Sequence, residues 1–215
     1  MKLGPALNEA FGKAYVLSLK RSIDRRAYIS DNCNAIGLDF EFIDAIEGKY
    51  FMNNTYYTRD GHMNTYILPV ATTAAYYAAQ IAIEYQIHKA LSDGLQSFIF
   101  MNDDVYFDNY QNFMQNDFLD IKMRLPSDWD IIILGNIHTA VSSTPVQYYL
   151  TTHHTPGCHA IAINHTAYHD YILEGSKREM VGDHLIDRLR ERGKRIYHLY
   201  PDICLQNREF ITTCL

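Results

Sequence analysis

Short apolar runs recur along the chain, and each is bounded by polar or turn-forming residues. A run of about four to eight apolar residues is typical of a β-strand that is buried on both faces. Such runs predict strands at Ala14–Leu19, Ser97–Met101, Asp130–Leu134, Cys158–Ile163 and Ile196–Tyr200. A further strand is indicated over positions 38–42, because Leu38, Phe40 and Phe42 alternate with two acidic residues.

Apolar residues at helical spacing lie between these strands. Ile29, Cys33 and Ile36 predict a helix that Ser22 can cap and that Gly37 ends. The same spacing predicts helices over Thr72–Ser92, from Tyr110 to Ile121, and over Thr166–Leu173 and Asp183–Arg192. Residues Glu47 to Leu68 have no clear periodicity, so we expect a long loop there, which in a compact domain is usually functional or mobile.

The order of these elements indicates the fold class. Strands alternate with helices and no hairpin turn signals join them, which is typical of an α/β fold with a mainly parallel central sheet and helices on both faces. No repeat, low-complexity tract or linker divides the sequence, so we expect a single domain over residues 1–215. In such sheets, ligands bind at the carboxyl ends of the strands.

Composition and charge narrow the functional classes. Of the 215 residues, 47% are hydrophobic and 20% are charged, as in an ordinary globular protein. The net charge is −6 without a long basic run, which argues against a nucleic-acid-binding surface and a polybasic membrane patch. No apolar stretch approaches the roughly 20 residues of a transmembrane helix, and no signal peptide is recognisable. We therefore expect a soluble protein, cytoplasmic by default, with no transmembrane segment.

The most informative chemistry follows the apolar run that ends at Met101. Asp103 and Asp104 place two adjacent carboxylates at a strand end, and both stay charged only if they are solvated or held by a cation. Oxygen ligands suit Mn²⁺ or Mg²⁺, and a site with few protein ligands leaves room for phosphate oxygens. The alternative is that the two aspartates only begin a turn.

Histidines and cysteines give little support for a dedicated zinc site. The four cysteines are scattered and form no C-x-x-C pair. Five histidines lie within positions 153–169, and His165 and His169 would share a helix face, but the glutamate of an H-E-x-x-H motif is missing. His159, which follows Pro156 and Gly157, is instead a candidate for an acceptor cleft.

Several segments, in order, resemble glycosyltransferase family 25. This family includes bacterial lipooligosaccharide galactosyltransferases and collagen hydroxylysine galactosyltransferases. The resemblance covers about residues 14–206, with Met101–Val105 at the position of the family's Leu-Glu-Asp-Asp-Val motif. The other matching segments are Tyr15–Arg21 with Asp24-Arg25-Arg26, Phe42–Gly48, Lys89–Leu91 with Gly94, Trp129–Gly135, Ala160–Ile163, Val181–Leu185, and Pro201–Gln206.

The resemblance implies a GT-A-type, metal-dependent transferase that inverts the configuration at the anomeric carbon. The implied donor is UDP-galactose or UDP-glucose, and the implied cofactor is Mn²⁺ or Mg²⁺. Asp104 is the first candidate for a metal ligand, beside Asp103, which would bind the metal or the donor. A metal that bridges the diphosphate neutralises the charge that grows on it as it leaves. His198 is a candidate for a third ligand, although an imidazole within strand packing has the same sequence signature.

Other residues acquire roles through the same resemblance. Asp183 is the candidate base that would take the proton of the acceptor hydroxyl, although an aspartate at a helix start is also a common cap. Leu19, Arg21 and Arg25 lie at the donor side after the first strand, where the guanidinium groups could hold phosphates or could be surface charges.

Two departures from the family pattern keep alternatives open. Asn102 replaces the glutamate before the paired aspartates, and Gln80 stands where the family has a histidine. An inactive nucleotide-sugar-binding module of the same fold and a metal-dependent nucleotidyltransferase are therefore alternative functions. The acceptor could be a glycan, a lipid-linked oligosaccharide or a hydroxylysine-bearing chain, and the sequence does not distinguish them.

Overall fold

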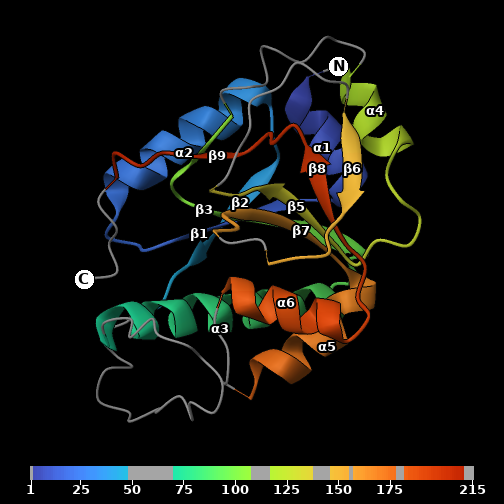
Figure 1. Ribbon diagram of the computed structural model, residues 1–215. Helices are drawn as coiled ribbons and strands as arrows, with labels where there is room; N and C mark the ends of the chain where they lie inside the picture. Colours follow the sequence, from blue (N-terminus) through green and yellow to red (C-terminus); the bar gives the residue numbers. More distant parts are fainter. Residues whose placement is uncertain are drawn as a thin grey trace.

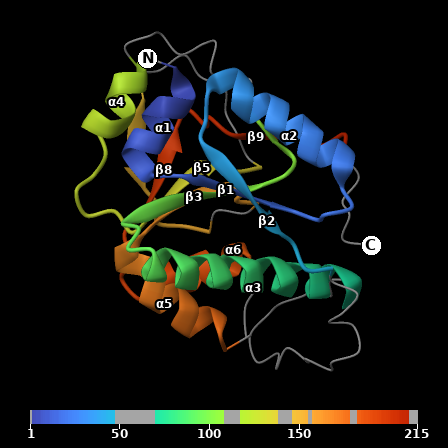
Figure 2. The ribbon, with the colours of Figure 1, turned by 180° about the vertical axis from the view of Figure 1, so that it is seen from behind.

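The computed structural model describes residues 2–47, 70–107, 117–137, 146–154, 157–177 and 182–210. A central β-sheet separates two layers of helices, as Figures 1 and 2 show from opposite sides. Helices α1 (Leu3–Phe11), α2 (Ile23–Ile36) and α4 (Asp117–Met123) cover one face, and α3 (Val70–Ser92), α5 (His165–Gly175) and α6 (Asp183–Glu191) cover the other. The predicted loop between Glu47 and Leu68 lies almost entirely outside the described residues.

The main sheet has seven strands in the order β2-β1-β3-β7-β5-β8-β6. Their bounds are β1 Ala14–Ser18, β2 Phe40–Asp44, β3 Ser97–Asn102, β5 Ile131–Gly135, β6 Gln147–Leu150, β7 Ala160–Asn164 and β8 Ile196–Tyr200. Five of these strands run in one direction, whereas β7 is antiparallel to β3 and β5, and β6 is antiparallel to β8. The expected α/β class, with a mainly parallel sheet between two helix layers, is confirmed.

Burial on both faces explains why most strands appear as continuous apolar runs. In β1, Ala14 and Val16 join the core under α1 and α2, whereas Tyr15 and Leu17 face the core under α3. A strand buried in this way has the same apolar run whether it is parallel or antiparallel to its neighbours. The reversed direction of β7 was therefore not visible in the sequence.

Helix α1 is one of the elements that the strand-and-helix pattern missed. Its buried residues Leu3, Leu7 and Phe11 follow helical spacing and pack against the sheet, with Phe11 meeting Trp129 edge to face. Gly4 lets the helix approach the end of α2 closely, since a Cβ at this position would lie 2.3 Å from the backbone nitrogen of Leu38. At α2, Ser22 occupies the predicted cap position, but its side chain makes no capping hydrogen bond.

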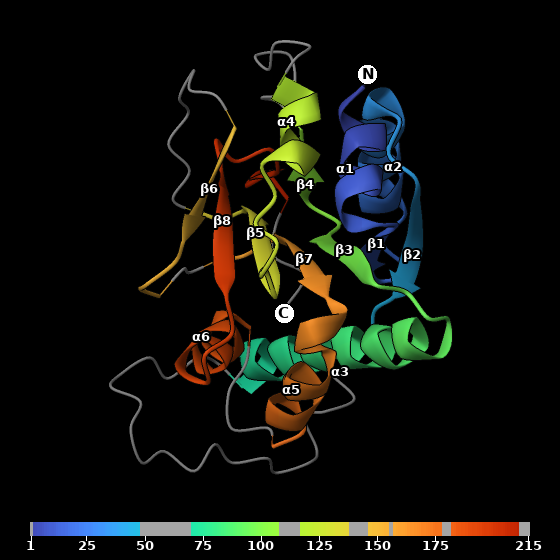
Figure 3. The same cartoon turned by 90° about the vertical axis from the view of Figure 1, so that its right-hand side faces the viewer.

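The carboxyl ends of β1, β2 and β3 meet at one edge of the sheet. Ser18 pairs with Asp44, and Leu17 pairs with Asn102. Immediately beyond, β4 (Val105–Tyr106) pairs with β9 (Leu205–Gln206), which brings the C-terminal segment alongside the end of β3. Figure 3 shows the sheet between its two helix layers from the side. Among the described residues, no helix is long and apolar enough to cross a membrane.

Candidate active site

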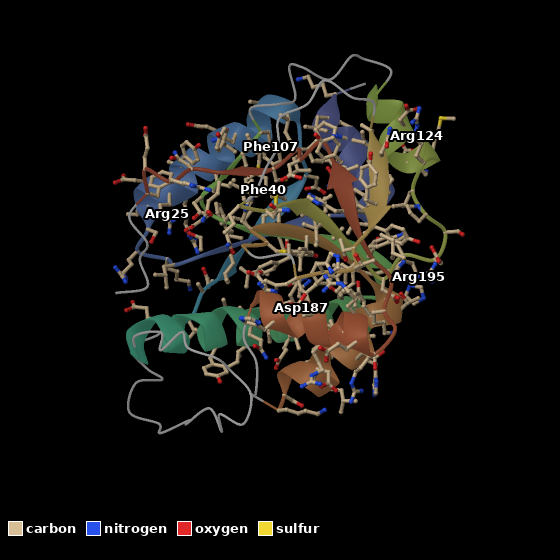
Figure 4. The ribbon with its side chains drawn as sticks, in the orientation of Figure 1. Arg25, Phe40, Phe107, Arg124, Asp187 and Arg195 are labelled. Atoms are coloured by element: carbon tan, nitrogen blue, oxygen red, sulfur yellow. The ribbon has the colours of Figure 1, made fainter. Side chains whose placement is uncertain are left out.

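The two adjacent aspartates lie where β3 ends, and both are nearly buried. Asp103 and Asp104 are 6% and 9% exposed. The guanidinium of Arg25, from the first turns of α2, bridges them: its Nη1 lies 3.1 Å from Asp103 Oδ1 and its Nη2 lies 3.3 Å from Asp104 Oδ2. Figure 4 shows Arg25 on the α2 side of the sheet. The structure thus brings together three of the residues that the sequence singled out.

Asp103 is also held by a residue from the neighbouring strand. Ser18, the last residue of β1, donates a hydrogen bond from Oγ to Asp103 Oδ2 over 2.6 Å. Burial raises the pKa of the Asp103 carboxyl above its ordinary value, and the Ser18 and Arg25 contacts oppose that rise without cancelling it. The carboxyl therefore holds its proton to a higher pH than an exposed aspartate does.

Asp104 is held by the C-terminal segment. Gln206 donates from Nε2 to Asp104 Oδ2 over 3.0 Å, and the backbone nitrogen of Asn207 donates to the Asp104 carbonyl over 2.7 Å. The other carboxylate oxygen, Oδ1, is buried and has no hydrogen-bond partner among the described residues. A buried carboxylate oxygen without a donor is costly, and a divalent cation is one group that would satisfy it.

A second arginine neutralises the end of β2. Arg26 donates from Nη2 to Asp44 Oδ1 over 2.7 Å and to the Ser18 carbonyl over 2.8 Å, and its guanidinium lies over the ring of Phe42. The Arg26 and Lys20 contacts lower the pKa of Asp44. Consecutive arginines at the start of α2 thus balance carboxylates from two different strands, which leaves the strand ends compact and almost neutral.

Aromatic residues cover Arg25. Its guanidinium carbon lies 5.2 Å from the ring centroid of Phe210, and that ring meets Tyr28 edge to face. The side chain of Arg25 is only 13% exposed as a result. Its predicted role toward the donor stays a prediction, and both terminal nitrogens of its guanidinium contact the paired aspartates.

The other two donor-side candidates lie in the turn between β1 and α2. Leu19 is half-buried, and its carbonyl accepts a hydrogen bond from the Ser22 backbone over 3.0 Å. Arg21 is 58% exposed and its Nε lies 3.4 Å from Glu47 Oε1. Both residues adjoin the same sheet edge as Asp103, and their roles toward a donor remain predictions.

Asp183, the candidate base, is the first residue of α6 and holds the segment that leads into β7. Its carboxylate accepts hydrogen bonds from the backbone nitrogens of Gly157 and Cys158. Two residues further on, the carbonyl of His159 accepts from the backbone nitrogen of Asn102, directly before the paired aspartates. Asp183 is therefore connected to the end of β3 through this segment, and its role as the base stays a prediction.

His198 lies on β8, where its imidazole contacts the Asp202 carboxylate and lies 3.4 Å from the side-chain nitrogen of Asn136. Asp202 and Asn136 are both buried. In the described part of the chain, His198 does not form a three-ligand cluster with Asp103 and Asp104. Its role as a metal ligand stays a prediction, and the structure accounts for the residue by its contacts within the sheet.

We expected His159 in an acceptor cleft, but the structure buries it. The ring is 2% exposed, with Nδ1 lying 3.1 Å from the Gly157 carbonyl and Nε2 lying 2.7 Å from the Cys204 carbonyl. It therefore joins the start of β7 to the C-terminal segment. A preceding Pro-Gly pair in the sequence is compatible with either location, so the sequence did not distinguish a cleft residue from a buried residue that links two segments.

Sequence reasoning missed two residues that hold the aspartates, Ser18 and Gln206. Ser18 is a polar residue at the end of an otherwise apolar strand, which was a usable signal for the strand's carboxyl edge. Gln206 was visible only as part of a motif. Neither partner could be assigned, because each lies far along the chain from the carboxylate that it contacts.

Comparison with known families shows the family of the chain. Residues 11–178 match the family model described as glycosyltransferase family 25 (LPS biosynthesis protein). The chain belongs to glycosyltransferase family 25. The matched residues include α2, β3 and the paired aspartates, so this family-25 glycosyltransferase has Arg25, Asp103 and Asp104 within the segment that defines its family.

One solved structure with similarity to the chain is a glycosyltransferase involved in the glycosylation of the major capsid of PBCV-1. The two share 14% sequence identity with a TM-score of 0.40, and the alignment covers 77% of this chain. It covers 66% of the other chain, just under two thirds of its length. No curated protein matches the chain by sequence.

Proposed function

We propose that this glycosyltransferase moves a hexose, galactose or glucose, from a UDP-sugar to a hydroxyl acceptor, with Mn²⁺ or Mg²⁺ as cofactor and with inversion at the anomeric carbon. The observation that carries the proposal is the pair of buried carboxylates at the end of β3, in which Asp104 Oδ1 has no hydrogen-bond partner among the described residues. Family membership supports glycosyl transfer, and this carboxylate oxygen supports the metal.

In this proposal Asp104 and Asp103 hold the ion. When bound, the ion neutralises charge on the departing diphosphate. Arg25 keeps the two carboxylates together. Because its fixed fork suits phosphate oxygens as well as carboxylates, the proposal also gives it a contact with donor phosphate. Leu19 and Arg21 would border the donor at the end of β1.

Asp183 is the proposed base. Inversion in a single displacement requires a group that takes the proton of the acceptor hydroxyl as its oxygen attacks the anomeric carbon. Each Asp183 oxygen accepts one backbone hydrogen bond, and an ionised carboxylate offers about four lone-pair sites in all. Asp183→Asn tests this role, but its amide nitrogen cannot accept a hydrogen bond, so the substitution also weakens the hold on Gly157 or Cys158. A loss of turnover much larger than the accompanying losses of UDP binding and stability supports the base, and losses of equal size indicate a purely structural role.

The acceptor that we favour is a lipid-linked oligosaccharide, because the matched family model is described as an LPS biosynthesis protein. A free glycan and a hydroxylysine-bearing chain are the other candidate acceptors. The deciding experiment offers each of the three acceptors to the protein with the donor that it hydrolyses and measures the glycosylated product.

The test of the proposed function is the release of UDP from UDP-galactose and UDP-glucose, each with Mn²⁺ or with EDTA. Slow hydrolysis of the donor needs no acceptor, so UDP that appears only with Mn²⁺ and disappears in Asp104→Asn supports the proposal. Asp128→Asn is a matched control, since that carboxylate is exposed and pairs with Arg195. Equal UDP release in EDTA and in Mn²⁺ would contradict the metal dependence.

One observation favours the inactive binding module as a second candidate. Gln80, at the position of the family's histidine, is buried and donates to the Gly175 carbonyl over 2.8 Å, so it ties α3 to the end of α5. An inactive module would bind UDP with Mn²⁺ and never release UDP from either sugar nucleotide. A nucleotidyltransferase would instead consume a nucleoside triphosphate and release pyrophosphate.

A further inference from the structure

Three metal-ligating side chains cluster beside α6, away from the paired aspartates. His154, His184 and Asp187 each offer one ligand atom, and these atoms all lie within 4.8 Å of one another. They are the one group of three or more His, Cys, Asp or Glu side chains with this geometry in the described residues. Figure 4 shows Asp187 on α6, across the sheet from Arg25.

Two parts of the chain supply the cluster. His184 and Asp187 are three residues apart on α6, so their side chains share a helix face. His154 comes from the segment that follows β6, and its Nδ1 contacts Asp187 Oδ2. The two imidazole rings stack with their centroids 5.0 Å apart and their planes 14° apart. The side chains are already gathered, and small rotations would aim both rings at one ion.

Neighbouring side chains hold the Asp187 carboxylate in place. Arg190, one turn further along α6, pairs with Asp187 Oδ1, and its Nε donates to Thr151 Oγ1 over 3.0 Å. Thr151 is itself anchored to the Ile196 carbonyl of β8. The oxygen Oδ2 is therefore turned toward the two imidazoles, and outer contacts of this type are what hold metal ligands in place.

We propose that His154, His184 and Asp187 form a site for a divalent transition metal such as Zn²⁺, distinct from the carboxylate site at the end of β3. Two imidazole nitrogens and one carboxylate oxygen suit zinc and its neighbours, whereas Mn²⁺ and Mg²⁺ prefer sets made of oxygen ligands. Both histidines are exposed, which leaves water or an external ligand to complete the coordination.

The bound ion would tie the segment before β7 to α6. Asp183, the neighbour of His184, already holds the backbone nitrogens of Gly157 and Cys158 in that segment. The ion would add a second link three residues earlier, at His154. Because binding occurs only in the folded protein, Zn²⁺ raises the thermal midpoint by an amount that depends on its concentration.

The experiment titrates Zn²⁺ into the metal-free full chain by calorimetry and follows Co²⁺ binding by its visible absorption. We expect a site that His154→Ala and His184→Ala each weaken by about 100-fold or more, since even outer-shell changes cost about 10- to 100-fold. His169→Ala is the matched control, because His169 is an exposed helical histidine outside the cluster. It should bind like the wild type.

Two measurements keep a folding defect apart from a binding defect. The thermal midpoints of the wild type and all three variants in EDTA should agree, and only the wild type and His169→Ala should gain stability with Zn²⁺. If the His154 and His184 variants bind Zn²⁺ as tightly as the wild type, or if the wild type does not bind it, the proposal is overturned. The readouts do not involve sugar transfer, so they are independent of the proposed function.

Discussion

Ser18 Oγ donates a hydrogen bond to Asp103 Oδ2 over 2.6 Å, although the two residues are 85 positions apart in the chain. Both side chains are almost completely buried, at the ends of the adjacent parallel strands β1 and β3. A hydrogen bond to an ionised carboxylate is shorter and stronger than a neutral one. This bond therefore fixes the Asp103 carboxylate directly at the edge of the sheet.

Replacing Ser18 by alanine should destabilise the protein and weaken the candidate metal site. Loss of a hydrogen bond to a charged group costs about 1.5–3 kcal/mol in the free energy of unfolding, because the carboxylate stays buried with one donor fewer. Urea unfolding measures this change. Ser176→Ala is the control, since its Oγ donates to the Leu173 carbonyl in an exposed hydrogen bond. Equal effects of the two substitutions would contradict this role for Ser18.

Replacing Arg25 should cost more, because two nearly buried carboxylates would lose their counter-charge. Removing one partner of a buried ion pair costs about 3–5 kcal/mol, so we expect a loss of that size for Arg25→Ala. Arg25→Lys should recover only part of it, because a lysine supplies one point charge in place of a fork that reaches both carboxylates.

The control for Arg25 is Arg188→Ala. Arg188 pairs with Glu191 on the surface of α6, and a surface pair of this kind contributes about 0–1 kcal/mol. Thermal or urea unfolding in EDTA measures all three variants. If Arg25→Lys were as stable as the wild type, one point charge would be enough to stabilise both carboxylates, and the forked guanidinium would not be required.

The pH dependence of stability should reveal the raised pKa of Asp103. A carboxyl whose folded-state pKa is raised contributes stability below its unfolded pKa of about 3.9, and that contribution is lost as the pH rises through the folded pKa. The free energy of unfolding of the wild type, relative to that of Asp103→Asn, should therefore fall as the pH rises from the unfolded pKa through the folded pKa. The measurement is urea unfolding in EDTA over a series of pH values.

Asp44→Asn is a control for which we expect the opposite dependence of stability on pH. Arg26 and Lys20 lower the pKa of Asp44, so its contribution is present above the unfolded pKa and is lost as the pH falls through the folded pKa. The stability of the wild type relative to Asp44→Asn should rise with pH. Parallel trends for the two variants would contradict the different environments of these carboxyls.

The fold class could largely be predicted from the sequence, because buried strands and helices have characteristic patterns of apolar residues. The apolar runs located β1, β3, β5, β7 and β8, and helical spacing located α2, α3, α5 and α6. Strand β6 was missed because its exposed residues, such as Tyr149 and Leu150, carry no alternation or apolar run of useful length. Strands β4 and β9 have two residues each, too few for any periodicity.

The site was readable only in part, because its contacts join distant segments. The aspartates were found from their place after an apolar strand, and Arg25 was found from the family resemblance. Ser18, Gln206 and the backbone groups that Asp183 holds became visible only in three dimensions. The metal-ligating group at α6 left one signal, the spacing of His184 and Asp187, but its third member, His154, lies about 30 residues earlier in the chain.

Gly135 offers the sharpest test of how the C-terminal segment supports the site. It ends β5, and a Cβ at this position would lie 1.9 Å from the Cys204 carbonyl oxygen and 2.6 Å from His159 Nε2. The Cys204 backbone cannot yield without moving β9 and Gln206, which holds Asp104. We expect Gly135→Ala to destabilise the protein by about 3 kcal/mol or more and to weaken Mn²⁺-dependent UDP binding.

Gly94→Ala is the control that separates a steric clash from backbone strain. Gly94 has φ +69°, and a Cβ at this position would meet no atom of the described residues within 4 Å, so this substitution should cost only the strain of a left-handed backbone, about 1–2 kcal/mol. Urea unfolding compares the two variants, and calorimetry with UDP and Mn²⁺ compares their binding. If Gly135→Ala lost stability but bound UDP as the wild type does, the C-terminal segment would not position Asp104 for the metal. If both variants lost binding equally, the effect would follow from reduced stability, because Gly94 lies in the turn before β3 and a Cβ there would meet no atom of the described residues within 4 Å.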